Sequence, residues 1–254
     1  MCSVSWIINE SGYHVFFNRD EQKSRALALP PRQLNVNGVE VLMPIDPAGN
    51  GSWVSLNEFG LSLCLLNNYQ GVVPSRTLRK SDLVSRGLLL KQLSGYANIK
   101  QIEHAFHQLN LNQFAPFTLL VFSPVTSSTP LSVVAFAWNG QESSIYPTEC
   151  PLFSSSVDVD AVKAYRLEQF RQFTADDNSV DSLLKFHAHH HPDQMHLSTC
   201  MHRADAQTVS MTYLNVSKSH QFMAYVPGSP CEHLSKQAIE QNQYQLCHKT
   251  SLVS

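Results

Sequence analysis

The chain has 254 residues, of which 43% are hydrophobic and 15% charged, and its formal net charge is −2. Such a chain can bury a large core, so we predict a single domain over residues 1–254, although two tightly joined lobes would fit the same length. The nearly balanced charge gives no attraction for nucleic acid or for an anionic membrane, and no run of about 18 apolar residues predicts a membrane span.

The first predicted elements form a hairpin that returns the chain to its start. Apolar runs at residues 4–9 and 13–18 predict two strands, and the Asn-Glu-Ser-Gly stretch between them predicts a turn. The hairpin places residues 18–21, Asn-Arg-Asp-Glu, beside the N-terminus. Residues 22–50 are rich in Pro, Leu and Asn, with a short strand at about 39–43. We interpret them as a long excursion that could cover a substrate cleft.

The remainder of the chain alternates strands with helices. Residues 53–56 and 61–66 predict a second hairpin, Ser81 is expected to cap a helix that ends near Leu93, and Asn139-Gly140 predicts a type I′ turn. Further helices are expected at residues 99–109, 160–173 and 180–186, and further strands at 117–122, 131–138, 208–216 and 221–226. This order predicts an α+β fold, a four-layer αββα sandwich of two mainly antiparallel sheets between helical layers, although it also fits a generic α+β fold.

Cys2 carries the strongest chemical signal in the sequence. Removal of Met1 gives Cys2 a thiol and a free α-amine, with ordinary pKa values of about 8.5 and 7.7–8.0, so the amine can accept the thiol proton near neutrality. The predicted hairpin brings Arg19 and Asp20 near this residue. A cation there favours the thiolate, and a carboxylate can hold the amine. The plainer alternative is an ordinary cysteine and an Arg-Asp pair on a surface turn.

Several motifs together resemble one protein family. They are Met1-Cys2, Asn18-Arg19-Asp20-Glu21, Gly51-Ser52-Trp53-Val54, Asn57-Glu58-Phe59-Gly60-Leu61, Leu66-Asn67-Asn68-Tyr69, Ser85-Arg86-Gly87 and Pro116-Phe117-Thr118-Leu119-Leu120-Val121. This set resembles the NRDE family, also called the transport and Golgi organisation 2 family. The family is similar in turn to the N-terminal nucleophile hydrolases of the choloylglycine hydrolase and penicillin acyltransferase branch, which have an αββα sandwich.

The resemblance implies amide hydrolysis or acyl transfer by Cys2, after removal of Met1 by an aminopeptidase or by autocatalysis. The catalytic residues that it implies are Cys2, Arg19, Asp20 and Asn67, with Asn67 as oxyanion donor. The substrate-binding residues that we predict are Asn18, Asn68, Trp53, Ser155 and Arg203.

Two departures from the hydrolase pattern favour an alternative. The order Asn18-Arg19-Asp20 differs from the Arg-Asn-x-Asp of the hydrolases, and the serines at 154–156 stand where a second asparagine is expected. These differences suit a non-catalytic carrier or binding protein for a small apolar ligand, with a role in trafficking or haem handling. Binding needs a cleft but not a complete catalytic set.

Cysteine and histidine usage completes the sequence prediction. Six cysteines without a Cys-x-x-Cys pair, in a chain with no export signal, predict free thiols in a reducing cytoplasmic compartment. The histidines at 187, 189, 190, 191 and 196 are expected on a surface loop and not in a metal site, because they follow a helix and flank Pro192. We therefore predict no metal and no cofactor, and a small-molecule substrate or ligand.

Overall fold

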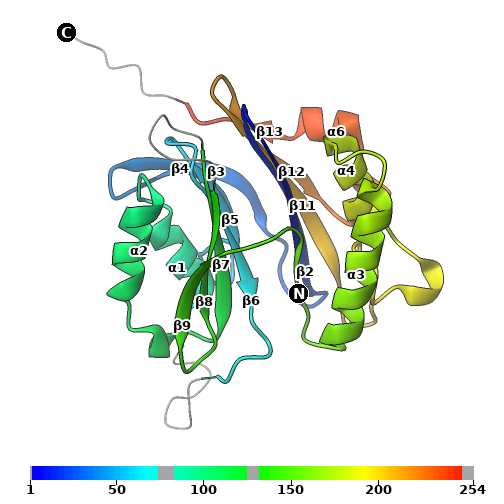
Figure 1. Cartoon of the computed structure of the whole chain (residues 1–254), viewed down its shortest axis with the longest axis horizontal. Coiled ribbons are helices and arrows are strands. Elements are labelled where there is room, and N and C mark those ends of the chain that lie inside the picture. Colours follow the sequence, from blue (N-terminus) through cyan, green and yellow to red (C-terminus); the bar gives the residue numbers. More distant parts are fainter. Residues whose placement is uncertain (1, 74–82, 125–131, 248–254) are drawn as a thin grey trace.

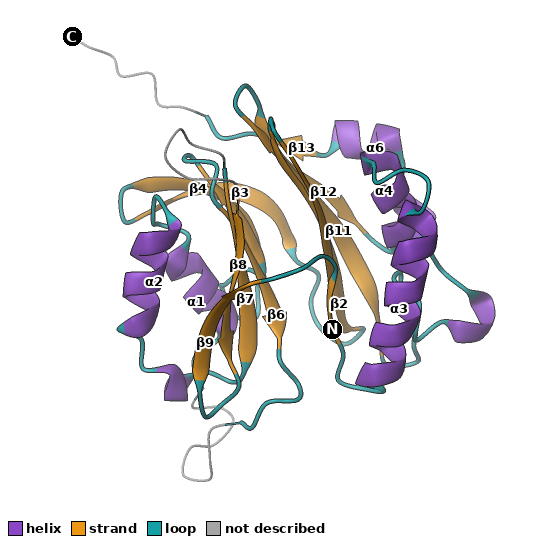
Figure 2. Cartoon of the chain, in the orientation of Figure 1, coloured by secondary structure: helices purple, strands orange, loops and turns teal. Residues whose placement is uncertain are grey.

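The computed structural model describes residues 2–73, 83–124 and 132–247. Two antiparallel sheets pack face to face, and helices cover the outer face of each sheet (Figures 1 and 2). The predicted α+β fold, with two antiparallel sheets between helical layers, is confirmed. None of the described helices is long and apolar enough to cross a membrane.

The six-stranded sheet contains the N-terminal hairpin at its centre. Strand β1 pairs along its whole length with β2 on one side, and its first three residues pair with β10 on the other, so the start of the chain is held on both sides. Strand β2 pairs in turn with β11. In their order across the sheet the strands are β10 (Leu152–Ser154), β1 (Cys2–Asn9), β2 (Gly12–Gln22), β11 (Ala206–Ser217), β12 (Gln221–Pro227) and β13 (Gln243–Tyr244).

The seven-stranded sheet follows the chain order, with each strand paired to the next. Its strands are β3 (Leu29–Val36), β4 (Val39–Ile45), β5 (Val54–Asn57), β6 (Ser62–Asn67), β7 (Phe117–Ser123), β8 (Ser132–Trp138) and β9 (Ser143–Pro147). Such a meander needs only short connections between neighbours, apart from the helical crossover between β6 and β7.

The helices form two outer layers. Helices α1 (Arg86–Leu93) and α2 (Ile99–His107) cover the seven-stranded sheet, and the others lie against the six-stranded sheet (Figure 1). The second group comprises α3 (Val159–Thr174), α4 (Val180–Ala188), α5 (Pro230–His233) and α6 (Lys236–Gln241), and single 3₁₀ turns occur at Leu111–Gln113 and Pro192–Gln194. The side chains of Asn98 and Ser179 cap α2 and α4 by accepting backbone N–H groups.

The main hydrophobic core lies between the two sheets. Alternation along β6 and β7 directs Cys64 and Phe122 to this core and Leu63 and Val121 to the helices. Both faces of these strands are therefore apolar, which explains why their sequence is a nearly continuous hydrophobic run.

The structure of residues 22–50 differs from the prediction. They do not form a loose excursion but contain the β3–β4 hairpin at the edge of the seven-stranded sheet. Asn37 and Gly38 both have positive φ, 54° and 89°, as a two-residue type I′ turn requires. Pro30 and Pro31 obscured the first strand in the sequence, because proline is tolerated only in an edge strand such as this one.

The predicted turn at Asn139-Gly140 and the predicted start of the helix that ends near Leu93 also differ from the structure. Asn139-Gly140 does form part of the β8–β9 hairpin, but the connection runs from residue 139 to 142 and the Asn139 side chain accepts the N–H groups of Gln141 and Glu142. The turn is therefore not a two-residue type I′ turn. Ser81 lies outside the described residues, and α1 begins at Arg86 after Ser85.

We predict that Phe122→Ala destabilises the protein by about 3–5 kcal/mol, because it opens a cavity in the core between the sheets. Its ring is fully buried and contacts Trp6 and Tyr13, at centroid distances of 5.5 and 5.7 Å. Phe59→Ala is the matched control, since that ring is 48% exposed, and should change stability by less than about 0.5 kcal/mol. Urea unfolding measures both, and equal effects would contradict the packing described here.

Candidate active site

Cys2 lies at the first position of β1, where three strands meet. It is opposite Arg19 on β2 and opposite Ser154 on β10, and only 9% of its surface is exposed to solvent. The side chain stands at the edge of the core between the sheets and also lines a cleft. The thiol is thus held by strands on both sides and faces a space that a small molecule can enter.

The cleft has a volume of about 570 Å³ and lies between the end of the N-terminal hairpin and the loops of the other sheet. Charged and polar groups dominate its walls. The lining residues are Cys2, Arg19, Asp20, Glu21, Gln22, Arg25, Asp46, Gly51, Ser52, Trp53, Leu65, Asn67, Tyr69, Val73, Leu83, Val84, Ser85, Arg86, Gly87 and Ala115. Gln22, Arg25 and Asp46 come from the two ends of the predicted excursion, so those ends do contribute to the cleft.

Arg19 is fixed in the cleft wall by a ring and two carboxylates. Its guanidinium carbon lies 4.2 Å from the centroid of the Trp53 ring, a cation–π contact. Its Nη2 lies 3.1 Å from Glu21 Oε2 and 3.6 Å from Asp46 Oδ2. Arg25 pairs with the same two carboxylates. The cation is therefore held in one orientation next to Cys2.

Asp20 faces the opposite side of β2, toward the helical layer. Thr208 Oγ1 donates a hydrogen bond of 2.6 Å to Asp20 Oδ1, and Arg166 Nη2 lies 3.7 Å from Asp20 Oδ2. Both charged side chains are completely buried. Burial lowers the pKa of Arg166, whereas the charges of Asp20 and Cys2 raise it. Asp20 thus anchors β2 to α3 directly behind the thiol.

The surroundings of Cys2 have opposing effects on the pKa of its thiol. Burial raises the pKa of the Cys2 thiol, and the charge of Asp20 acts in the same direction. The positive charge at the chain terminus, a hydrogen bond from the Asp20 backbone and the charge of Arg19 lower it. Burial outweighs the other effects, so the pKa of the thiol is raised and its neutral form is favoured. A neighbouring α-amine is a group that can accept the proton of such a thiol.

Asn67 ends β6 and lines the same cleft as Cys2. Its carboxamide Nδ2 donates a hydrogen bond of 2.9 Å to the hydroxyl of Tyr69, which also lines the cleft. The structure therefore brings Cys2, Arg19, Trp53 and Asn67 together around one cavity. Asp20 also borders this cavity, but its carboxylate points away from it into the helical layer.

Four other predicted site residues lie elsewhere. Asn18 is fully buried under the helices, where its Nδ2 donates to the carbonyls of His187 and Thr199 at 2.8 and 3.0 Å. Asn68 and Ser155 line an adjacent cleft of about 200 Å³, which shares Asn67 and Tyr69 with the first. Arg203 lines neither cleft, and its Nε donates to Asp205 at 2.8 Å.

Two glycines set the approach of α1 to the cleft. Ser52 N donates to the Gly87 carbonyl at 3.2 Å, and a Cβ built on Gly51 would lie 2.3 Å from the carbonyl carbon of Gly87. Only a residue without a side chain fits so close a backbone contact. The contact joins two of the sequence motifs and holds Trp53 and Arg86 around the same space.

Sequence comparison decides which family the chain belongs to. The sequence profile of the family described as Transport and Golgi organisation 2 matches residues 1–248. The chain belongs to this family. The resemblance carried by residues 18–21 and the downstream motifs is thereby confirmed. No curated protein sequence matches the chain.

Solved structures show the fold to which this family member is similar. Penicillin V acylase from Agrobacterium tumefaciens is 10% identical, over 89% of this chain and 83% of that one, with a TM-score of 0.55. The Caenorhabditis elegans ortholog of N-acylethanolamine-hydrolyzing acid amidase is 13% identical, over 97% and 100%, with a TM-score of 0.53. A variant of conjugated bile acid hydrolase from Clostridium perfringens is 11% identical, over 89% of each chain, with a TM-score of 0.51. The fold of this transport and Golgi organisation 2 family member is therefore that of the N-terminal nucleophile hydrolases.

Three arginines at or next to the site were not predicted, namely Arg25, described above, Arg166 and Arg86. Arg166 on α3 donates to Ser3 Oγ at 2.6 Å and to the Leu197 carbonyl at 3.0 Å, next to Asp20. Its signal in the sequence is a charged residue one turn after Val162 on the buried face of a predicted helix. Arg86, the first residue of α1, lines the cleft and donates to the Pro116 carbonyl at 2.9 Å.

The histidine run is not entirely on a surface loop. His187 belongs to α4 and is fully buried, with its Nε2 2.8 Å from Ser5 Oγ and its ring against Phe16 and Phe186. The helix extends beyond the predicted residue 186 because the ring fits the apolar interface with the sheet. Burial, together with the charge of Arg166, lowers the pKa of His187 to about 3.

We predict that His187 makes the protein less stable in acid. The pKa of about 3 in the folded state is below the ordinary value of about 6.5, so between these values the unfolded state binds a proton that the folded state does not. Stability should therefore fall by up to about 1.4 kcal/mol per pH unit as the pH decreases through this window. Urea unfolding at several pH values should show a flatter dependence for His187→Gln, whereas the exposed His196→Gln should keep the wild-type slope. An unchanged slope in His187→Gln would contradict a neutral buried ring.

We also predict that Arg19→Gln slows alkylation of Cys2 by iodoacetamide at neutral pH. Loss of the cation raises the pKa of the thiol, and each unit lowers the thiolate fraction about tenfold. Arg25→Gln is the matched control, because Arg25 lines the same cleft but is not a cause of the Cys2 shift. Peptide mass spectrometry of the alkylated protein measures both rates. Equal rates in wild type and Arg19→Gln would rule out this electrostatic role.

Proposed function

We propose that the chain is an N-terminal cysteine nucleophile amidohydrolase or acyltransferase that acts on a small amide or ester after removal of Met1. The observation that carries this proposal is the position of Cys2, whose thiol shares one cleft with Arg19 and Asn67. The similar solved structures are by name an acylase, an acid amidase and a hydrolase, which supports the same class of chemistry.

The proton and bond changes follow from an N-terminal cysteine. The α-amine of Cys2 accepts the thiol proton, and the thiolate attacks the substrate carbonyl carbon and forms a carbon–sulfur bond. The ammonium then donates its proton to the leaving amine or alcohol as the bond to the acyl carbon breaks. In hydrolysis, water attacks the thioester carbon and gives a proton to the α-amine. The carbon–sulfur bond then breaks, the acid leaves, and the ammonium returns the proton to the Cys2 thiolate. In acyl transfer, a second amine or alcohol takes the place of water.

The neighbouring side chains have separate roles in this proposal. Arg19 favours the thiolate, and Asp20 holds β2 in place through Thr208 and Arg166. Asn67 is the oxyanion donor. A carboxamide nitrogen has two N–H groups, and the bond to Tyr69 uses one of them, which leaves the other for the developing oxyanion.

The walls of the cleft favour a polar substrate over an apolar cargo. Three guanidinium groups, those of Arg19, Arg25 and Arg86, lie around it with the carboxylates of Glu21 and Asp46. Polar groups placed in this way select ligands by hydrogen bonds and charge. The alternative of a non-catalytic carrier for a small apolar ligand therefore has less support from this site.

We predict that Cys2→Ala abolishes turnover of amide and ester substrates found with a panel of N-acyl compounds, and that Asn67→Ala lowers kcat by about 10²–10³, the loss expected for one oxyanion donor. Asn68→Ala, at the adjacent position but in the neighbouring cleft, is the matched control and should retain most of the activity. Steady-state kinetics of the three variants on the best substrate provide the measurement.

Mass spectrometry of the mature protein tests the same proposal independently. It should show a chain that begins at Cys2 and a covalent adduct on Cys2, ahead of the other cysteines, after treatment with an acylating β-lactone. An active preparation with intact Met1, or full activity in Cys2→Ala, would disprove the mechanism. Ligand binding without turnover that persists in Cys2→Ala would indicate the carrier instead.

A further inference from the structure

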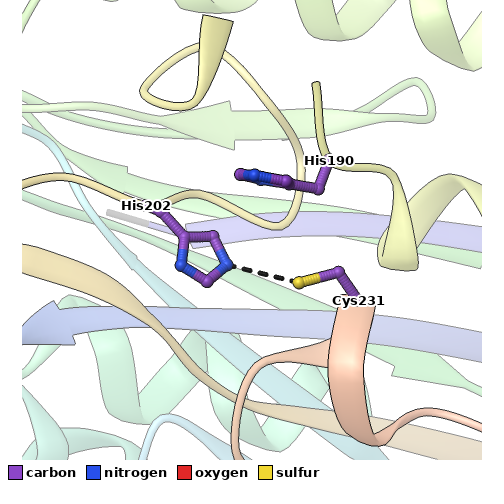
Figure 3. A group of neighbouring side chains, drawn as sticks. All are labelled: His190, His202 and Cys231. Atoms are coloured by element: carbon purple, nitrogen blue, oxygen red, sulfur yellow. Dashed lines mark hydrogen bonds between the residues drawn. The ribbon is translucent and has the colours of Figure 1, made fainter. Parts of the chain in front are cut away.

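Three side chains with metal-binding atoms meet on the helical side of the six-stranded sheet, outside the cleft. They are His190 after α4, His202 before β11 and Cys231 in α5 (Figure 3). Each offers one ligand atom, and these atoms all lie within 4.8 Å of one another. His202 Nε2 is 3.3 Å from Cys231 Sγ. Three separate segments of the chain thus place nitrogen and sulfur atoms close together.

Cys200 adds a second sulfur to this cluster. Its Sγ lies 3.6 Å from the same His202 Nε2 and accepts a hydrogen bond of 3.4 Å from the Cys231 backbone N–H. In a tetrahedral zinc site with Zn–S of about 2.3 Å and Zn–N of about 2.05 Å, a sulfur and a nitrogen ligand are about 3.6 Å apart. The two sulfur–nitrogen distances here are close to that separation.

The orientation of His190 also suits a ligand. Its Nδ1 lies 3.2 Å from the Cys200 carbonyl oxygen, so a proton on Nδ1 donates to that carbonyl. The other ring nitrogen, Nε2, then keeps its lone pair. A backbone carbonyl that fixes the tautomer in this way is the usual support for a metal-binding histidine.

We propose that His190, His202, Cys231 and Cys200 bind one zinc ion. Two imidazoles and two thiolates are a donor set that zinc prefers in tetrahedral structural sites, whereas magnesium and calcium require oxygen ligands. The ion would join the end of α4, the segment before β11 and helix α5. The first two of these are already connected by the backbone bond from the Cys200 N–H to the His189 carbonyl, at 2.9 Å.

This site lies behind Asp20. The Met201 N–H, between two of the ligands, donates to Thr208 Oγ1 at 2.8 Å, and Thr208 Oγ1 donates to Asp20 Oδ1 at 2.6 Å. Ser229, two residues before Cys231, donates to the Thr208 carbonyl at 3.1 Å. The ion therefore has a structural role, in that it stabilises the segments that support Asp20.

Metal analysis of the full-length protein tests the site without reference to turnover. Wild-type protein reconstituted with zinc under reducing conditions should hold one zinc per chain. In Cys231→Ser and His202→Ala the zinc affinity should fall more than about 100-fold, because changes outside the ligand sphere alone cost about 10–100-fold. The exposed Cys247→Ser and His196→Ala are matched controls and should bind as wild type.

Cobalt substitution in the wild-type protein keeps the test decisive where a variant fails to fold. Co²⁺ should give the thiolate-to-cobalt charge-transfer band and the intense visible bands of tetrahedral coordination, and added zinc should remove them. Zinc should also raise the thermal unfolding midpoint of the wild type in a concentration-dependent manner. Wild-type protein that binds no zinc, octahedral cobalt spectra, or equal zinc loss in the Cys247→Ser control would overturn the proposal. A Cys200–Cys231 disulfide that persists in reductant and prevents zinc binding would also overturn it.

Discussion

The pairing of β1 with β2 is the constraint on which the candidate site depends. It places Arg19 opposite Cys2, and because successive side chains on a strand point to opposite faces, it divides residues 18–21 between two layers. Arg19 and Glu21 contact each other at the cleft, while Asn18 and Asp20 bind groups of the helical layer. A shift of one residue in register would exchange the two pairs, so the short motif serves both the chemistry and the packing.

The buried contact between Asp20 and Arg166 shows how charge is tolerated in this packing. Both side chains are inaccessible to water, and each has additional hydrogen-bond partners, among them Thr208 and Ser3. Such a pair contributes little net stability, but loss of one partner leaves an uncompensated charge at a cost of about 3–5 kcal/mol. The pair therefore defines one arrangement of α3 against β2 behind Cys2.

Local signals in the sequence were sufficient to predict the layers of the fold. They were insufficient to predict contacts between residues that are far apart in the sequence. Period-two patterns predicted the central hairpins, but β3 escaped notice because Pro30 interrupts its pattern, even though Asn37-Gly38 is a turn signal that could have located it. Cys2, Arg19 and Asn67 were found because family motifs mark them. The spacing of Arg166 from Val162 marks it as a buried position, but nothing in the sequence names Asp20 as its partner. The proximity of His190 to Cys231 has no sequence signal, since it arises from how α4 and α5 lie on the sheet.

The close backbone contact between Gly51 and Gly87 joins two walls of the cleft. It presses the start of α1 against the segment that carries Trp53, with no space for a methyl group between them. A Cβ at Gly51 would lie 2.3 Å from the Gly87 carbonyl carbon, so the backbone next to Arg86 would have to move. A Cβ at Gly87 would lie 3.0 Å from Ser52 N, which requires a smaller shift. Because β1 and β2 are not part of this contact, a change at either glycine would alter the shape of the cleft opposite Cys2 and leave the strands around the sulfur in place.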